Sequence, residues 1–386
     1  MSWEKTTLGS VADIFSGYAF KSADMNAECG TPLLKIKNIA GSRVSNECDT
    51  FLNVDFDLSK YDRFLLREED FLVAMTGQGS VGRIGKMINY KSGYYVNQRV
   101  AIVRVNGQKA NPVFIFSQIA TKENENELFK KANGAGQPNI SAKQIGELEL
   151  VLPDIDTQNR IANVLSAYDD LIENNQKQIK LLEEAAQRLY KEWFIDLHFP
   201  GYENTPIIDG MPYGWSKRLV GDVIEKSYRS KQVMASDYLK EGKIPIIDQS
   251  RVFIAGYTND KEPLVCLNRP VIVFGDHTRI LKYIQFPFAK GADGTQLILS
   301  NCENMPQPLL YLCLQNVDLS NYHYARHFKY LKAEEIIVPD IDVANAFEEM
   351  INPMFKKIQT MRDQIRNAQQ ARDRLLPKLM SGELEV

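Results

Sequence analysis

Two stretches of the chain carry apolar residues at alternating steps of three and four, the spacing that places side chains on one face of a helix. The first series is Leu165, Tyr168, Ile172, Asn175, Ile179, Leu182, Ala186, Leu189 and Trp193, with the asparagine as its one polar member. The same spacing returns later in the chain at Ile351, Met354, Ile358, Met361, Ile365, Ala368, Arg372, Leu375 and Leu379. This pattern predicts two helices of about 40 residues, roughly 60 Å long, that pack on each other in coiled-coil fashion.

Four residues at or near these helices refine the prediction. Pro353 lies early in the second series and should break or restart that helix near its first turns. Asn175 either fixes the register between the packed helices or is a polar residue tolerated at a wet point, and the sequence leaves both readings open. Asp154 and Asp156 are spaced like paired carboxylates, but at a helix start we expect them to cap backbone amides.

The interval before each helix has short apolar runs separated by turn residues, which predicts strands and loops. Two landmarks recur: the segment that begins at Trp3 returns from Trp215, and Leu152-Pro-Asp-Ile-Asp returns from Val338. The chain therefore contains two copies of one plan, a strand-rich domain closed by a long helix. The expected boundaries are a first domain at 1–152, a first helix at 153–199, a linker at 200–214, a second domain at 215–338, and a second helix with its tail at 339–386.

Composition is typical of a soluble globular protein. The chain has 386 residues, of which 44% are hydrophobic and 25% charged, and no apolar run approaches the roughly 20 residues of a membrane span. The opening residues do not have the pattern of a signal peptide. The five cysteines form no Cys-x-x-Cys pair, so we expect buried or idle thiols in a reducing, cytoplasmic compartment.

The net charge of −3 identifies no partner, but the basic residues are clustered. Residues 71–122 contain seven Lys or Arg and no acid, and residues 319–333 contain five Lys, Arg or His and again no acid. Such stretches are typical of a surface that contacts phosphates, or of a solvated sheet face that is incidentally basic. In the second stretch, Arg326 and Lys329 are candidates for phosphate contacts.

The glycines Gly77, Gly79 and Gly82 have the Gly-x-Gly-x-x-Gly spacing of loops that wrap a nucleotide phosphate. A nucleotide site would need a helix directly after the loop, whereas residues 83–88 alternate like a strand. No acidic residue follows at the distance at which dinucleotide-binding folds bind a ribose. We therefore expect the glycines to shape an exposed loop between strands, with a nucleotide-binding enzyme as the alternative.

Other catalytic motifs are missing from the sequence. It has no nucleophile elbow, no phosphate-binding loop with its lysine, and no Asn-Pro-Pro-type box of base methylation. His323 and His327 are four residues apart, like zinc ligands on a helix, but no third ligand accompanies them. We expect surface or base-contacting histidines, no metal, and a binding protein instead of an enzyme.

Loops rich in Gly, Thr, Asn, Gln and Arg at strand ends supply the donors that base edges and phosphates require. In the first copy the candidate DNA-contacting residues are Thr76, Gln78, Ser80, Arg83 and Lys86. In the second copy they are His277, Thr278, Arg279 and Lys282. Arg83 and Arg279 occupy corresponding places, as do Lys86 and Lys282, because the same interval of sequence separates the members of each pair.

In combination, several segments resemble the specificity subunit of type I restriction-modification systems. The segments similar to its target recognition domains and first spacer helix are 72–77 (LVAMTG), 96–100 (VNQRV), 275–278 (GDHT), 292–296 (ADGTQ), 137–141 (QPNIS) and 169–175 (DDLIENN). The second copy departs from the pattern, because 327–331 (HFKYL) replaces the Gln-Pro-Asn-Ile segment and its helix lacks the Asp-Leu-Ile-Glu-Asn run.

The resemblance implies an α+β fold with two β-rich target recognition domains, each followed by a long helix. The two helices would pack as an antiparallel coiled-coil spacer, within a pseudo-twofold internal repeat. It also implies a chain without catalysis of its own that reads a bipartite double-stranded DNA target, one half per domain, with the gap set by the helices. Two methyltransferase subunits would bring S-adenosylmethionine, and two motor-nuclease subunits, where present, would bring ATP and Mg. On this chain itself we expect no cofactor, no membrane contact and no small-molecule substrate.

The resemblance also places residues. Further DNA contacts are expected from Asn97, Gln98, Arg99, Gln137, Asn139, Thr295 and Gln296. Contacts with partner subunits are expected along the helices from Leu165, Tyr168, Ile172, Asn175, Ile179, Leu182, Leu189, Ile358, Met361, Ile365 and Leu375. Two alternatives to this function stay open: a coiled-coil interaction scaffold, and the specificity subunit of a related system whose methylation and cleavage are fused in another chain.

Overall fold

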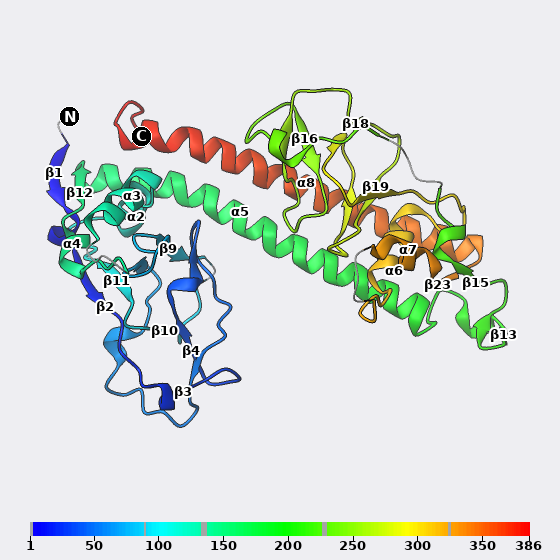
Figure 1. The fold of residues 1–386 in the computed structure, drawn as a ribbon, viewed down its shortest axis with the longest axis horizontal. Helices are drawn as coiled ribbons and strands as arrows, with labels where there is room; N and C mark the ends of the chain where they lie inside the picture. Colours follow the sequence, from blue (N-terminus) through cyan, green and yellow to red (C-terminus); the bar gives the residue numbers. More distant parts are fainter. Residues whose placement is uncertain (1–2, 89, 133–136, 226–229, 323–325) are drawn as a thin grey trace. The chain divides into compact units, whose positions relative to one another are not determined.

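The chain forms two compact units in the computed structural model, which describes residues 3–88, 90–132, 137–225, 230–322 and 326–386 (Figure 1). The first unit consists of residues 1–175 and 364–386, and the second of residues 176–363. The boundary passes through both long helices, α5 (Ile155–Tyr190) and α8 (Ile341–Met380), so each unit contains a part of each helix.

The described residues of the first unit form three β-sheets. The largest has the strand order β2-β11-β8-β9-β6-β5, a second has the order β10-β4-β7-β3, and β1 pairs with β12. Their bounds are β1 Glu4–Thr7, β2 Ala12–Ser16, β3 Met25–Asn26, β4 Thr31–Leu34, β5 Ile39–Ala40, β6 Ser42–Val44, β7 Phe51–Leu52, β8 Phe71–Ala74, β9 Ile84–Met87, β10 Tyr95–Val96, β11 Val100–Val105 and β12 Glu149–Leu152. Strand β8 is buried throughout, as expected for a central strand with both faces covered.

Short helices flank these sheets: α1 Leu8–Val11, α2 Pro112–Ile119, α3 Lys122–Lys131 and α4 Ala142–Gly146. Their starts follow from local sequence. Asn111 accepts hydrogen bonds from two amides at the start of α2, Thr121 accepts one at the start of α3, and Ser141 forms a capping box with Gln144 at α4.

The second unit repeats this arrangement with fewer strands. Its sheets have the orders β20-β19-β22, β17-β16-β21-β18, β15-β23 and β13-β14. Their bounds are β13 Ile207–Ile208, β14 Met211–Pro212, β15 Ser216–Leu219, β16 Ile244–Ile247, β17 Gly256–Thr258, β18 Leu264–Val265, β19 Val271–Gly275, β20 Leu281–Ile284, β21 Phe288–Lys290, β22 Thr295–Ile298 and β23 Glu335–Val338. The helices are α6 Gln307–Gln315 and α7 His327–Ala333, and a π-helical turn, Lys191–Ile195, follows α5.

The strand registers confirm the internal repeat. Glu4 pairs with Leu152 in the β1–β12 sheet, and Ser216 pairs with Val338 in the β15–β23 sheet. These strand pairs contain the two landmarks that recur in the sequence. The central strands also correspond, because β8 lies between β11 and β9 as β19 lies between β22 and β20, all antiparallel. The predicted α+β plan of two β-rich domains, each followed by a long helix, is thus confirmed.

The long helices run antiparallel to each other within each unit. In the first unit, Asn175 Nδ2 donates to Gln364 Oε1 (3.2 Å), and Arg372 pairs with Asp169 at 2.5 Å. In the second unit, Arg362 pairs with Glu183 at 2.8 Å. The polar residue Asn175 is buried and has a specific partner on the other helix, which supports its role in fixing the register.

The expected break at Pro353 is wrong, because α8 continues through it. A proline inside a helix costs about 3 kcal/mol, since it removes a hydrogen bond and crowds the preceding turn. Ile351 and Phe355, on either side of it, are both buried in the main hydrophobic cluster of the second unit. Burial of such side chains contributes about 1.5–3 kcal/mol each, so tertiary packing outweighs the local penalty.

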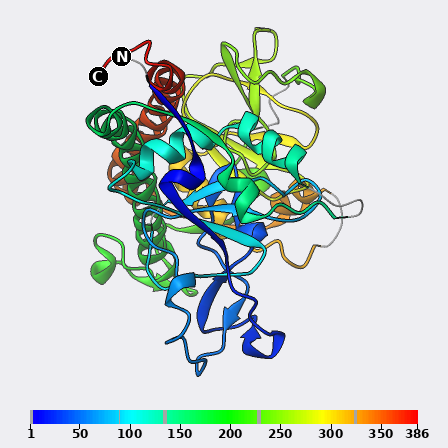
Figure 2. The ribbon, with the colours of Figure 1, turned by 90° about the vertical axis from the view of Figure 1, so that its left-hand side faces the viewer.

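The end of α8 belongs to the core of the first unit. Leu379 is fully buried in the same cluster as Phe114 and Leu165. The C-terminal end of α8 lies close to strand β1 there, as both views show (Figure 1, Figure 2): an added Cβ on Gly382 would lie 3.4 Å from the ring of Trp3, and Arg160 Nε donates to the main-chain oxygen of Val386 at 2.6 Å.

Burial corrects five of the partner-binding assignments. Leu165, Ile172, Asn175, Ile358 and Met361 are at most 4% exposed within the chain's own helix packing, so they are not available to another subunit while the helices remain packed. The other six keep some exposure, and for them partner contact stays a prediction: Tyr168, Ile179, Leu182, Leu189, Ile365 and Leu375.

Candidate nucleic-acid interface

Three polar segments of the first unit meet at the end of strand β8. The Met75 amide donates to the Arg99 carbonyl (2.9 Å), and the Met75 carbonyl accepts from the Ile140 amide (2.9 Å). The Gly77 amide also donates to the Pro138 carbonyl (3.2 Å). The glycine loop, the turn at 97–99 and the segment at 137–139 are therefore neighbours, although they are far apart in the sequence.

The second unit has the same junction at the end of strand β19. The Asp276 amide donates to the Gly294 carbonyl (2.7 Å), and the Asp276 carbonyl accepts from the His327 amide (3.0 Å). Asp276 thus takes the place of Met75, Gly294 that of Arg99, and His327 that of Ile140. In each unit one residue after the central strand ties together a hairpin loop, the turn before the next strand, and the start of a short helix.

Most of the residues predicted to contact DNA in the first unit lie at this junction. Gln78, Gln98, Arg99, Gln137 and Asn139 are exposed, and Thr76, Ser80, Arg83 and Asn97 are half-buried. Thr76 forms a β-bridge with Asn139. The structure brings these nine together on three adjoining segments.

Lys86 lies apart from them, on strand β9, where its ammonium pairs with Glu69 at 3.0 Å.

The glycine loop has a backbone that needs glycine. Gly77, Gly79 and Gly82 have φ values of 107°, 76° and 85°, a region that other residues rarely adopt. A Cβ on Gly82 would lie 2.7 Å from the Glu125 carbonyl oxygen. The Arg83 guanidinium donates to the Gly79 carbonyl at 2.6 Å and so closes the loop on itself. Strand β9 follows the loop directly, so there is no helix N-terminus to hold a nucleotide phosphate.

In the second unit the predicted residues divide into two groups. Five are exposed and lie on the junction segments: His277, Thr278, Arg279, Arg326 and Lys329.

Gln296 is half-buried on strand β22. Lys282 and Thr295 are buried, with 4% and 0% exposure, and their predicted contact with DNA is wrong. The Thr295 hydroxyl donates to the Ala292 carbonyl, so its hydrogen-bonding capacity is used within the turn.

The expected correspondence between the copies is also wrong, by one residue. Gly82 donates to the carbonyl of Ala74, and Arg279 donates in the same way to the carbonyl of Gly275. Arg279 therefore corresponds to Gly82, and like it has a positive φ, of 60°. Further along the hairpin, Leu72 pairs with Gly85 and Val273 pairs with Lys282.

Lys282 consequently corresponds to Gly85 instead of Lys86. Side chains alternate between the faces of a strand, so a shift of one residue places Lys282 on the opposite face from Lys86. This explains why one lysine is buried and the other reaches solvent.

The basic stretch at 71–122 is less positive than its composition suggests. Arg104 forms two hydrogen bonds to the buried carboxylate of Asp70, the shorter at 2.6 Å. Lys86 pairs with Glu69, and Lys122 pairs with Glu125 at 2.9 Å. Acidic residues outside the stretch thus neutralise three of its charges, and Arg99 is an exposed cation that lies at the junction.

His327 is buried, contrary to the expectation of a surface or base-contacting histidine. Its ring nitrogens lie 2.8 Å from the Asp276 carbonyl and 3.1 Å from the Tyr322 carbonyl. It stabilises the junction from inside. His323 lies outside the described residues.

The capping role of Asp154 is confirmed: it accepts from the Thr157 amide at 2.9 Å, and this bond holds the pKa of the carboxyl below its ordinary value.

Sequence reasoning missed one segment of the second junction, the loop at 248–253. Gln249 Oε1 accepts from the His277 amide (3.1 Å), its Nε2 donates to the Asp293 carbonyl (2.8 Å), and its carbonyl accepts from the Thr278 hydroxyl (2.6 Å). Arg251 in the same loop is exposed. The signal was present in the sequence, because the polar run 248–251 (DQSR) directly follows a short apolar run, 244–247.

Two classes of site find no support in the described part of the chain. No three His, Cys, Asp or Glu side chains gather there to hold a metal ion. None of the described helices combines the length and the apolar character needed to cross a membrane.

Comparisons with known proteins agree with this geometry. The family model described as the type I restriction modification DNA specificity domain matches residues 1–184. The type I restriction enzyme MjaIX specificity subunit of Methanocaldococcus jannaschii is 29% identical over 300 residues, which cover 71% of this chain and 69% of that protein. The type I restriction enzyme HindI specificity subunit of Haemophilus influenzae is 26% identical over 54% of this chain and 44% of its own length.

A solved structure shows the same fold over nearly the whole chain. The S subunit of a type I restriction-modification system from M. genitalium superposes with a TM-score of 0.62, covering 98% of this chain and 96% of that one, at 16% sequence identity. The resemblance predicted from the sequence is therefore confirmed: the chain is similar over most of its length to type I restriction-modification specificity subunits, and its residues 1–184 match the family model of the type I restriction modification DNA specificity domain.

Proposed function

We propose that this chain is a DNA-specificity subunit that reads a bipartite double-stranded target, one half with each junction. The observation that carries the proposal is the repeated junction. Two units with different loop residues hold those loops on the same backbone hydrogen bonds, at Met75 and at Asp276. Two equivalent frames with different polar side chains are suited to reading two different short sequences.

The chain would act without catalysis of its own. Methyltransferase subunits would bring S-adenosylmethionine and modify adenines, and motor-nuclease subunits, in a system that restricts, would bring ATP and Mg. The long helices would set the unread gap between the two halves. The family relationship supports this division of labour, since the similar proteins are specificity subunits of restriction enzymes.

For the methyltransferase contact we propose exposed apolar side chains instead of the buried seam. In the segment after α5, Ile207 and Ile208 are 57% and 52% exposed, and Tyr213 is 68% exposed. These side chains lie on one hairpin, because β13 pairs with β14, and a group of exposed apolar side chains is a feature of protein-interaction surfaces. Changing Ile207 and Tyr213 to Ser should reduce co-purification of the methyltransferase, whereas changing the exposed Glu203 to Ser should not. Unchanged recovery of the complex in the double variant would refute this surface.

The reading function is tested by sequencing the methylated sites of a host that carries the chain with its methyltransferase. The expected result is one split motif. Gln78 and His277 form a matched pair, since both are exposed on the hairpin loop of their junction. Gln78→Ala should weaken the sequence preference in the half read by the first unit, and His277→Ala should weaken it in the other half. The expected loss of discrimination is about 1–3 kcal/mol for a base contact. A methylated motif without a gap, or relaxation of both halves by either variant, would contradict the proposal.

A further inference from the structure

Strand β6 supports the β8–β9 hairpin of the first unit, and the described residues of the second unit include no equivalent strand. In the first unit, β6 pairs in parallel with β9, and Ser42 is opposite Gly85 in this register. In the second unit, β20 takes the place of β9, and no strand among the described residues pairs with its outer edge.

The loop at 248–253 follows β16 as the segment containing β6 follows β4. Strands β4 and β16 correspond, because each pairs in parallel with the strand that precedes the junction turn, β10 or β21.

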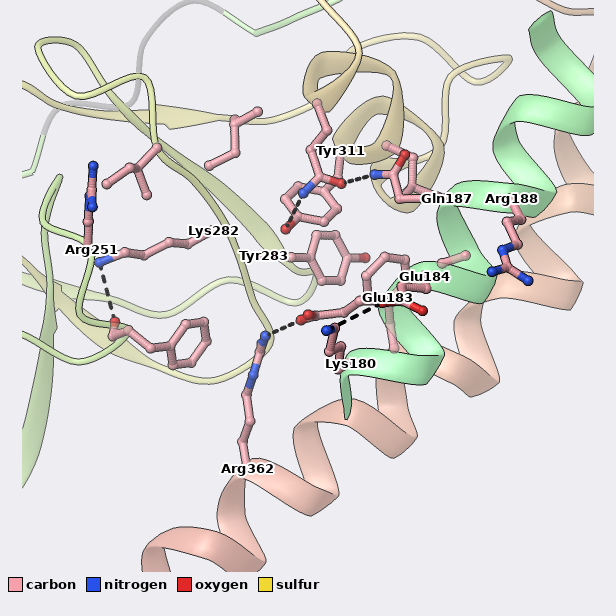
Figure 3. A pocket seen from close by; sticks show the side chains of 17 residues that line it. Lys180, Glu183, Glu184, Gln187, Arg188, Arg251, Lys282, Tyr283, Tyr311 and Arg362 are labelled. Atoms are coloured by element: carbon pink, nitrogen blue, oxygen red, sulfur yellow. Dashed lines mark hydrogen bonds and ion pairs between the residues drawn. The ribbon is translucent and has the colours of Figure 1, made fainter. Parts of the chain in front are cut away.

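Lys282 joins this loop to β20. It occupies the register position of Gly85, and its ammonium donates to the carbonyls of Asp248 (2.9 Å), Val252 and Phe253. The side chain is 4% exposed, and the Asp248 carboxylate lies 3.8 Å away. Figure 3 shows the lysine extending from its strand toward the loop, beside a cavity of about 590 Å³ that Arg251 and Tyr283 also line.

The Lys282 ammonium binds the loop and is not available to bind a ligand. The ammonium donates to two backbone carbonyls of one loop at 2.5 and 2.9 Å, a third carbonyl lies 3.5 Å away, and at 4% exposure the group is closed to a phosphate. Burial lowers the pKa of Lys282 to about 8, because desolvation disfavours the charged ammonium. The bonds of Gln249 then tie the same loop to the turns that contain His277 and Asp293.

We propose that Lys282 is a positioning residue for DNA reading by the second unit. It replaces the strand pairing that β6 provides in the first unit, and holds the loop at 248–253 so that the exposed Arg251 contacts the DNA half read by this unit. This inference rests on the proposed function, and it assigns to the second junction a fourth segment with its own cation.

The test uses the full chain in complex with its methyltransferase and measures binding to duplexes that are changed in one half of the target at a time. Lys282→Met and Arg251→Ala should each lower the preference for the correct second half by about tenfold or more, the scale of one base contact in such an interface. Preference for the first half should not change. The double variant should lose no more than either single variant, because both changes remove the same contact.

Lys290→Met is the matched control, since Lys290 is a second buried lysine of this unit. It should keep the preference for the second half whatever it does to stability. Arg251 is exposed, so the Arg251→Ala chain should fold. It tests the contact between Arg251 and the second half of the target even where the Lys282 variant cannot be purified folded.

Two results would overturn the role of Lys282 while leaving the proposed function intact. One is an unchanged preference for the correct second half in the Arg251→Ala complex, and the other is a loss of preference in the double variant that equals the sum of the two single losses. A wild-type complex that prefers no sequence at all would overturn both.

Discussion

Truncation of Leu379 to Ala should destabilise the first unit, although this residue is near the C-terminus. Leu379 is fully buried in the cluster that also contains Phe114 and Leu165. A fully buried Leu→Ala change costs about 3–5 kcal/mol, which combines the lost transfer free energy with that of the cavity left behind. For a unit of about 200 residues, each kcal/mol lowers Tm by roughly 2–4 °C, so the expected shift is about 6–20 °C.

The two units need not unfold together, so the assay should resolve them. Hydrogen exchange read on peptides from β11 and β19 reports the first and second units separately, since each is a central strand of its sheet. In the Leu379→Ala protein we expect faster exchange in β11 and unchanged exchange in β19. Leu384→Ala serves as the control, because Leu384 is 40% exposed and its truncation should change stability by no more than about 0.5 kcal/mol.

Two outcomes would refute this reasoning. Unchanged protection of β11 would show that α8 does not complete the first core in solution. Equal loss of protection in β11 and β19 would show that the units unfold as one, contrary to their separate hydrophobic clusters.

Three further predictions follow from the packing of the helices and the buried lysine. Ile358→Asp should destabilise the second unit by about 3 kcal/mol or more in chemical denaturation, because it buries an unpaired carboxylate, whereas the exposed neighbour Lys357→Asp should not. Asn175→Ala should cost about 0.5–1.5 kcal/mol, since it removes a partly buried hydrogen bond to Gln364 on α8; an unchanged stability would show that Asn175 is only a tolerated polar residue on the seam. The folded-state pKa of Lys282 is about 8 and its ordinary value is 10.5, with Asp248 as the facing carboxylate, so the unfolded chain binds more protons between these values. Stability of the wild type relative to Lys282→Met should therefore rise from about pH 8 to 10.5 and be constant below pH 8, and a flat difference would contradict burial of the ammonium.

The sequence was sufficient to predict the long helices and the repeat. Helical spacing depends on local geometry that is the same in every helix, so the series through Leu165 and Ile358 could be recognised without tertiary information. The landmarks at Trp3 and Leu152 recur at Trp215 and Val338 because they form the same strand pair, β1–β12 and β15–β23.

The sequence was not sufficient where two distant segments meet. A constant interval between the copies aligned Arg83 with Arg279, but the strand registers align Arg279 with Gly82. The hairpin loops differ in length, so one constant interval does not align the strands that follow them. An error of one residue in this alignment places a side chain on the wrong face of its strand. The burial of Lys282, the contribution of Leu379 to a distant core and the continuation of α8 through Pro353 have the same origin, since each depends on what packs against the residue.

The two junctions indicate how such a chain can change its target without changing its fold. At the equivalent positions of the junctions, Met75 is replaced by Asp276 and Ile140 by His327, yet the backbone bonds between the three segments are the same. The frame therefore depends on main-chain groups, which every residue except proline supplies in full. The exposed side chains around it, such as Gln78 in one unit and His277 in the other, are then free to differ. Substitutions among these exposed residues should alter which bases are read while leaving stability nearly constant, whereas substitutions of Lys282 should affect both.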